Sequence, residues 1–175
     1  MKNETINFDI MFLPIDIISS WKRASISSSF CSHLLNTSHA NKKYIENIIS
    51  TVVNECLEFS IKHGVKKTEN YTLSCKQTNE KTSITLSLYL QSQQITLLKN
   101  YIKKIQVIKE NNELETILFT KEFSELGYAI YSLIKDYKGK IKIEPIKKKE
   151  KPSSIIKTNI ILNLNIKDIK NDYQN

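Results

Sequence analysis

Histidine and cysteine are the side chains that most often bind metals or act as nucleophiles, and this chain has three of each. The histidines His33, His39 and His63 do not have the spacing of a metal-binding motif. No HExxH, GxxxxGK[ST], GxSxG or GxGxxG motif occurs. The cysteines are Cys31, Cys56 and Cys75. Because they are odd in number, widely spaced and lack a CxxC pair, we expect no disulfide framework, no zinc ribbon and a reducing cytoplasm.

One continuous segment does carry a recognisable pattern. It reads Asn54-Glu55-Cys56-Leu57-Glu58-Phe59-Ser60-Ile61-Lys62-His63 and resembles the N-box of the GHKL (histidine kinase-like) ATPase superfamily, which includes histidine kinases and anti-sigma serine kinases. Downstream, residues 126–131 and 137–143 resemble its second glycine box with the following helix and strand. With Ser20–Ser25 and Phe30, the chain is similar to compact bacterial regulators of the SiaB type over Ile6–Ile166.

The resemblance implies a role for Glu55 and exposes a departure at Phe59. In the superfamily a glutamate acts as general base, and an asparagine one helical turn later holds Mg²⁺. A separation of four residues places both on one helix face. Glu55 is retained, but Phe59 stands at the asparagine position. A phenyl ring has no oxygen for a hard cation, so we expect no metal site, and Phe59 fills the pocket as a packing residue.

The phosphate and adenine positions depart from the family pattern as well. The first glycine box supplies an aspartate and glycines, whereas this chain has Gln91-Ser92-Gln93-Gln94. The second box keeps Ser124 and Gly127, but Glu125 replaces a glycine and would repel phosphate. The resemblance therefore implies a vestigial nucleotide site. Its residues are Asn54, Phe59, Lys62, Ser124 and Gly127, with Glu55 as a candidate base that is itself vestigial.

Hydrophobic periodicity predicts the elements that position these residues. Strands are expected at Ile6–Leu13, Ile17–Lys22, Asn70–Lys76, Ser83–Leu90, Lys140–Ile146 and Ile155–Ile166. Helices are expected at Ser25–Leu35, Lys43–His63, Ile95–Lys109, Leu114–Phe119 and Ser124–Tyr137. In the first helix we expect one apolar side, formed by Ile26, Phe30, Leu34 and Leu35. Gly64 is expected as a left-handed helix cap.

Paired strands with helices between the pairs predict an α+β fold in one domain, residues 1–166, with a polar tail at 167–175. We expect a two-layer α/β sandwich whose mixed, mostly antiparallel sheet is covered by helices on one face. The resemblance makes this the GHKL (Bergerat) type. No apolar run is long enough for a membrane span, and the first residues do not have the pattern of a signal peptide.

The net charge is +8, but 25 of the 26 cationic residues are lysine, and Arg23 is the single arginine. Arginine is the usual residue for reading bases and gripping phosphates, so nucleic acid is an unlikely partner. A basic nucleic-acid-binding module that uses the lysine-rich loop 147–151 remains a second alternative.

The leading hypothesis is a cytoplasmic bacterial regulator with a degenerate nucleotide site and no cofactor. The resemblance implies that it acts by binding another protein, such as a STAS-type antagonist in a partner-switching pathway, and that it forms a homodimer. The first alternative is an active protein serine/threonine kinase of the SiaB or anti-sigma type. It would use Mg·ATP, with Glu55 as base and Ser124 and Gly127 at the phosphates.

Overall fold

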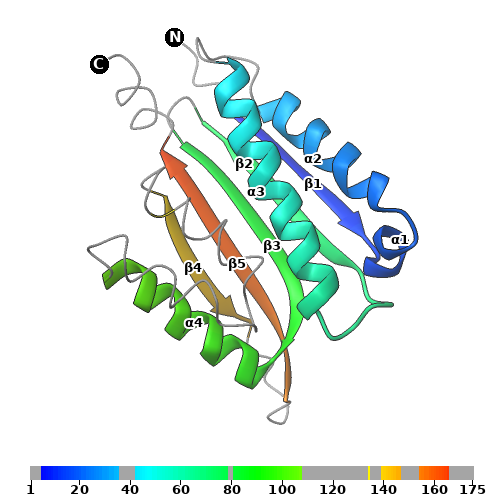
Figure 1. The fold of residues 1–175 in the computed structure, drawn as a ribbon, viewed down its shortest axis with the longest axis vertical. Coiled ribbons are helices and arrows are strands. Elements are labelled where there is room, and N and C mark those ends of the chain that lie inside the picture. Colours follow the sequence, from blue (N-terminus) through cyan, green and yellow to red (C-terminus); the bar gives the residue numbers. More distant parts are fainter. Residues whose placement is uncertain are drawn as a thin grey trace.

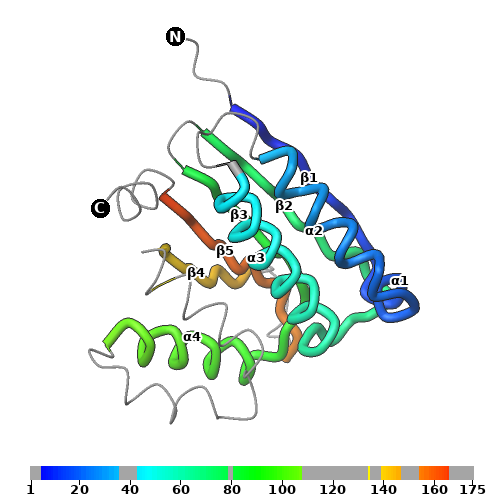
Figure 2. The backbone as a smooth tube through the Cα atoms, turned by 45° about the horizontal axis from the view of Figure 1, so that its top comes forward, coloured from blue at the N-terminus to red at the C-terminus, as the bar shows by residue number. Residues whose placement is uncertain are grey.

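The chain forms one five-stranded sheet that carries helices on one face (Figures 1 and 2). A computed structural model describes residues 5–35, 42–78, 81–107, 134, 139–146 and 154–165. The strands are β1 (Ile6–Phe12), β2 (Tyr71–Gln77), β3 (Lys81–Gln91), β4 (Lys140–Pro145) and β5 (Ile155–Asn165). Their order in the sheet is β1-β2-β3-β5-β4, so β1 and β4 are the two edges.

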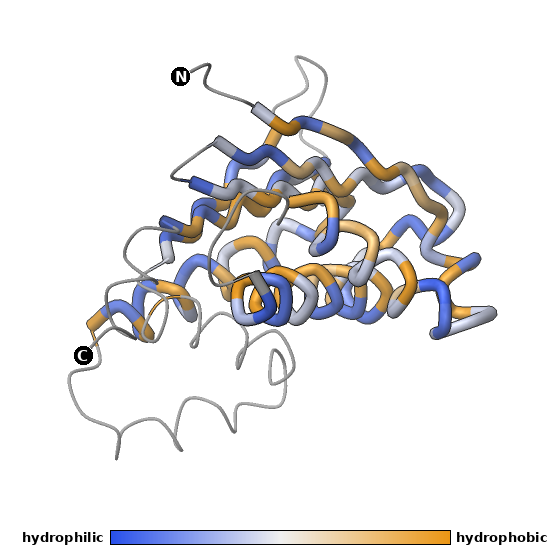
Figure 3. Tube along the Cα trace, turned by 90° about the horizontal axis from the view of Figure 1, so that it is seen from above, coloured by the Kyte–Doolittle hydropathy of each residue, from blue (hydrophilic) through white to orange (hydrophobic). Residues whose placement is uncertain are grey.

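All four strand pairings are antiparallel, which corrects the expectation of a mixed sheet. In each strand one residue in two faces the helices. Along β3 the buried face is Thr82, Ile84, Leu86, Leu88 and Leu90, and hydroxyl residues alternate with it. Figure 3 shows this alternation of apolar and polar residues along the strands. A sheet with one apolar and one polar face needs a helix layer on one side only, so the expected two-layer α+β plan is confirmed.

The helix layer consists of α1 (Pro14–Ile18), α2 (Trp21–Leu35), α3 (Lys42–His63) and α4 (Ser92–Val107). The long helix α3 follows the apolar spacing that the sequence predicts. It packs beside α2 and lies against the middle of the sheet (Figure 1). The helices predicted at Leu114–Phe119 and Ser124–Tyr137 lie outside the described residues apart from Ile134, and so do loop 147–151 and the tail 167–175.

Two local predictions were wrong. The strand expected at Ile17–Lys22 is instead the end of α1 and the start of α2. Pro14 occupies the first turn of α1. Its fixed φ angle favours helical geometry, so a helix starts directly after β1.

The sequence pattern did not indicate which side of α2 is buried. Ile26 and Phe30 are 58 % and 53 % exposed. The buried side is made mostly of small residues, namely Ala24, Ser28, Cys31, Ser32 and Leu35. Ser28 and Ser32 satisfy their hydroxyls by donating to backbone carbonyls three residues earlier, so their burial leaves no hydroxyl unbonded. Small side chains let α2 pack against α3, and the side of α2 that carries Ile26 and Phe30 faces solvent.

The second wrong prediction is the left-handed cap at Gly64, which ends α3 with its backbone outside the left-handed region. A side chain at this position would collide with the Ser60 carbonyl oxygen and the Tyr71 hydroxyl. Tyr71 is fully buried, and its hydroxyl accepts a hydrogen bond from the Lys66 backbone N–H at 3.1 Å. Position 64 therefore requires glycine, because neighbouring atoms leave no space for a Cβ atom.

We expect Gly64→Ala to lower the free energy of unfolding by about 1–3 kcal/mol, because the added methyl group must displace backbone or a fixed ring. Urea unfolding of the two proteins measures this difference. An unchanged unfolding midpoint would show that the turn after α3 moves aside without cost, and would contradict this account of Gly64.

Among the residues that the structure describes, no helix combines the length and apolar composition that are needed to cross a bilayer.

Candidate functional site

The N-box-like segment forms the C-terminal half of α3, and its side chains divide into two rows. Residues four apart lie one above the other on a helix, so Glu55, Phe59 and His63 form one row. Asn54, Glu58 and Lys62 form the neighbouring row, which is more exposed to solvent. Both rows come from the helix that the sequence predicted best, so three residues that the resemblance singles out, Glu55, Phe59 and Lys62, lie on adjacent faces of α3.

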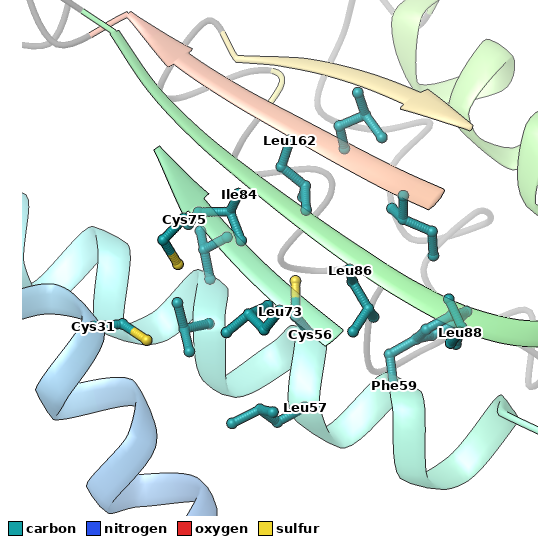
Figure 4. Close-up of a cluster of buried hydrophobic side chains, with 14 of the residues drawn as sticks. Cys31, Cys56, Leu57, Phe59, Leu73, Cys75, Ile84, Leu86, Leu88 and Leu162 are labelled. Atoms are coloured by element: carbon teal, nitrogen blue, oxygen red, sulfur yellow. The ribbon is translucent and has the colours of Figure 1, made fainter. Parts of the chain in front are cut away.

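Phe59 is a core residue, with 2 % of its surface exposed. Its ring lies near Leu88 of β3 in the apolar layer between α3 and the sheet (Figure 4). The His63 ring packs against it, with ring centroids 4.6 Å apart and an interplanar angle of 36°. Burial of this ring contributes about 1.5–3 kcal/mol to the folded state. At the position where the resemblance implies a metal-binding amide, the structure thus has a buried aromatic ring.

The side chains of the solvent-facing row interact with one another. Asn54 donates its side-chain amide to Glu58 Oε1 at 2.9 Å, and Lys62 Nζ lies 3.6 Å from Glu58 Oε2. Lys62, one of the site residues that the resemblance implies, therefore faces a carboxylate on its own helix. That pair is half-exposed and contributes about 0.3–0.5 kcal/mol. Glu55 is half-buried on the adjacent row, one turn before Phe59.

Gln94 fixes the start of α4 against the end of α3. Its side-chain oxygen accepts a hydrogen bond from the Gln91 backbone N–H at 2.8 Å, and its side-chain nitrogen donates to the His63 carbonyl at 3.2 Å. The first bond is one half of a capping box, in which the third helical residue reaches back to the N-cap. The fold therefore brings Gln91–Gln94 next to the C-terminal end of α3.

Sequence reasoning did not find this role for Gln94. The signal that could have found it is a glutamine three residues after Gln91, at the boundary between an alternating strand and a helical pattern. The partner on α3, a backbone carbonyl thirty-one residues away, has no sequence signal. Ser124 and Gly127, the remaining predicted site residues, lie outside the described residues.

We expect Gln94→Glu to lower the free energy of unfolding by about 1–3 kcal/mol, because a carboxylate keeps the bond to Gln91 but faces the His63 carbonyl without a hydrogen to donate. Gln93→Glu is the matched control, since it adds the same charge at the neighbouring exposed position. Thermal unfolding of both variants measures the effect, and equal midpoints would show that the Gln94 bridge is not structural.

The three cysteines are all buried free thiols. Cys56 faces the core from α3, and burial, with the nearby Glu55 charge adding to it, raises its thiol pKa to about 12. The Cys75 thiol is hydrogen-bonded to Cys31, and that bond together with burial raises the pKa of Cys75. Cys56 and Cys75 therefore stay protonated and are structural. The same hydrogen bond lowers the pKa of Cys31, but the Cys31 side chain is fully buried and has no contact with solvent. Within the described ranges, no group of three or more His, Cys, Asp or Glu side chains could hold a metal ion.

Comparison with solved structures finds a similar fold. No family model matches the sequence, and no curated protein does. The fold is similar to a chain in a solved structure described as "The crystal structure of SiaB-SiaC complex from Pseudomonas aeruginosa". The TM-score is 0.54 at 10 % sequence identity, and the match covers 86 % of this chain and 96 % of that chain. At such low identity the likeness concerns the fold alone, and the SiaB-like fold expected from sequence is confirmed at that level.

Proposed function

We propose that this protein is a bacterial regulator that acts by binding another protein and has lost ordinary Mg·ATP binding. A SiaB-like fold supports a regulatory role in a partner-switching pathway, and a complex between two proteins is what the structural neighbour represents. We further assign the fold to a degenerate GHKL type, in which α3 carries the N-box. Its place in the cytoplasm is part of the same proposal.

The observation that carries the proposal is the burial of Phe59 one turn after Glu55. Mg²⁺ needs oxygen ligands in near-octahedral geometry, and a phenyl ring offers none. Loss of the metal removes the charge neutralisation on which phosphoryl transfer depends. The pairing of Lys62 with Glu58 and the double hydrogen bond of Gln94 support the same conclusion, because each engages a side chain in the region where a nucleotide would bind.

The partner that we propose is a small STAS-type protein. The direct test is a calorimetric titration of the full chain with purified STAS-type proteins of the same organism, without nucleotide. We expect one of them to bind at micromolar concentration or below, with no phosphate added to it when Mg·ATP is present. If no STAS-type protein binds, the partner class is wrong. If the bound protein gains a phosphate, the chain is an active serine/threonine kinase, as the first alternative holds.

A further inference from the structure

Two of the buried thiols meet between α2 and the sheet. The Cys75 thiol of β2 donates a hydrogen bond to the Cys31 sulfur of α2. Both residues have 0 % of their surface exposed. Figure 4 shows the two side chains approaching each other from the two elements. Sulfur atoms in hydrogen-bond contact need only a modest movement of the side chains to reach the length of a disulfide bond.

The strand register and a ring contact place the same positions together. Phe8 of β1 is directly opposite Cys75 of β2, so these two side chains lie on one face of the sheet. Phe30, the residue before Cys31, contacts the Phe8 ring edge to face, with centroids 6.2 Å apart. The meeting of the two thiols is therefore fixed by the way α2 packs over β1 and β2.

The hydrogen bond selects one pair out of three thiols. Cys56 of α3 lies in the same apolar layer (Figure 4). Along the chain it is closer to Cys31 and to Cys75 than these two are to each other. Closing a short loop costs less entropy than closing a long one, so random pairing in an unfolded chain favours pairs that include Cys56. A selective link between Cys31 and Cys75 therefore requires the folded structure.

α2 can separate locally from the rest of the fold at a low cost. Among the buried residues of this helix, Leu35 is the one large apolar side chain, and the others are Ala24, Ser28, Cys31 and Ser32. Because little apolar surface becomes exposed, such an opening needs less free energy than global unfolding. A small oxidant can then reach thiols that the closed structure shields from solvent.

We propose that Cys31 and Cys75 are an oxidative modification site, at which hydrogen peroxide produces a reversible disulfide that ties α2 to β2. The Cys31 thiolate attacks one peroxide oxygen and becomes a sulfenic acid. The O–O bond breaks, and the hydroxide that leaves takes up the proton that the Cys31 thiol released. The Cys75 sulfur then attacks the Cys31 sulfur, the S–O bond breaks, and the oxygen leaves as water with the Cys75 proton.

One peroxide is thus reduced to two water molecules while two thiols are oxidised to one disulfide. Cys31 reacts first, because the hydrogen bond from Cys75 lowers its pKa and a thiolate is the reactive form. In a reducing compartment the pair rests as thiols, and a dithiol reductant returns the disulfide to that state.

Mass spectrometry of the full, folded chain after treatment with hydrogen peroxide tests the proposal. The remaining thiols are then alkylated with N-ethylmaleimide in urea, and peptide mapping identifies the linked cysteines. We expect a product that has lost two hydrogen atoms, carries one alkylated thiol at Cys56 and contains a link between Cys31 and Cys75. Dithiothreitol should remove this link. The same oxidation in urea should give mixed pairs that include Cys56.

Two variants serve as matched controls. Cys56→Val keeps both members of the pair and should form the same link, whereas Cys75→Ala should form no link. The wild-type map decides even if a variant does not fold. Three alkylated thiols after treatment of the folded chain overturn the proposal, and so does a link that includes Cys56 as often as in urea. The test needs neither nucleotide nor partner protein, so its outcome is independent of the proposed function.

Discussion

Phe59→Ala is expected to lower the free energy of unfolding by about 3–5 kcal/mol, since it removes a buried ring from the layer between α3 and the sheet. The loss includes the contact with the His63 ring as well as the apolar packing near Leu88. Phe59→Leu is the matched control, because it keeps an apolar side chain of intermediate size and should lose a smaller part of the stability. Urea unfolding at neutral pH measures all three proteins.

A loss below about 1 kcal/mol for Phe59→Ala would contradict the assignment of Phe59 as a packing residue. It would show that the site tolerates a cavity, as a former ligand pocket open to solvent would. A large loss is the result expected of a ring that the fold needs. The loss expected for Phe59→Ala is a large share of the total, because the free energy of unfolding of an ordinary domain is about 5–15 kcal/mol.

Stability should also fall steeply in alkaline solution, because burial holds the pKa of the Cys56 thiol at about 12. An unfolded cysteine ionises near pH 9, so above that pH the unfolded state releases a proton that the folded state keeps. The stabilisation is complete below pH 9 and is lost as pH rises toward 12. A shift of three units corresponds to about 4 kcal/mol.

Thermal unfolding between pH 8 and pH 11 measures this dependence. Cys56→Val is the control, because it removes the titrating group and keeps an apolar side chain of similar size at the buried position. The slope should become shallower in this variant and not vanish, since burial also raises the pKa of Tyr101 to about 12. If the wild type and the variant have the same slope, the buried thiol does not govern alkaline unfolding.

The main helix and the strands could be predicted because their burial is one-sided and regular. α3 keeps the apolar spacing from Ile45 to Ile61, and β3 alternates strictly along its length. α2 could not be oriented from its pattern, because its inner side is small and polar and its outer side carries Ile26 and Phe30. Apolar periodicity indicates which residues share a side, but not which side meets the core when a second apolar surface is available.

The candidate site shows the same division. The spacing of Glu55 and Phe59 predicted that they share a face, and the helix makes that a local property. The burial of Phe59 could also be predicted, because Phe59 lies beside Cys56 and Ser60 on the side of α3 that meets the core. The bridge from Gln94 to His63 could not be predicted, because it depends on how α4 begins relative to the end of α3, which tertiary packing sets.

We propose that this SiaB-like fold works without Mg·ATP because Phe59 occupies the position where the resemblance implies a metal ligand. Calorimetric titration of the wild-type chain with ATP in excess Mg²⁺ tests it most directly, with a parallel titration in a metal chelator. We expect no binding, or binding only at millimolar ATP that is the same with and without the metal. Micromolar binding that disappears when Mg²⁺ is removed would contradict the claim.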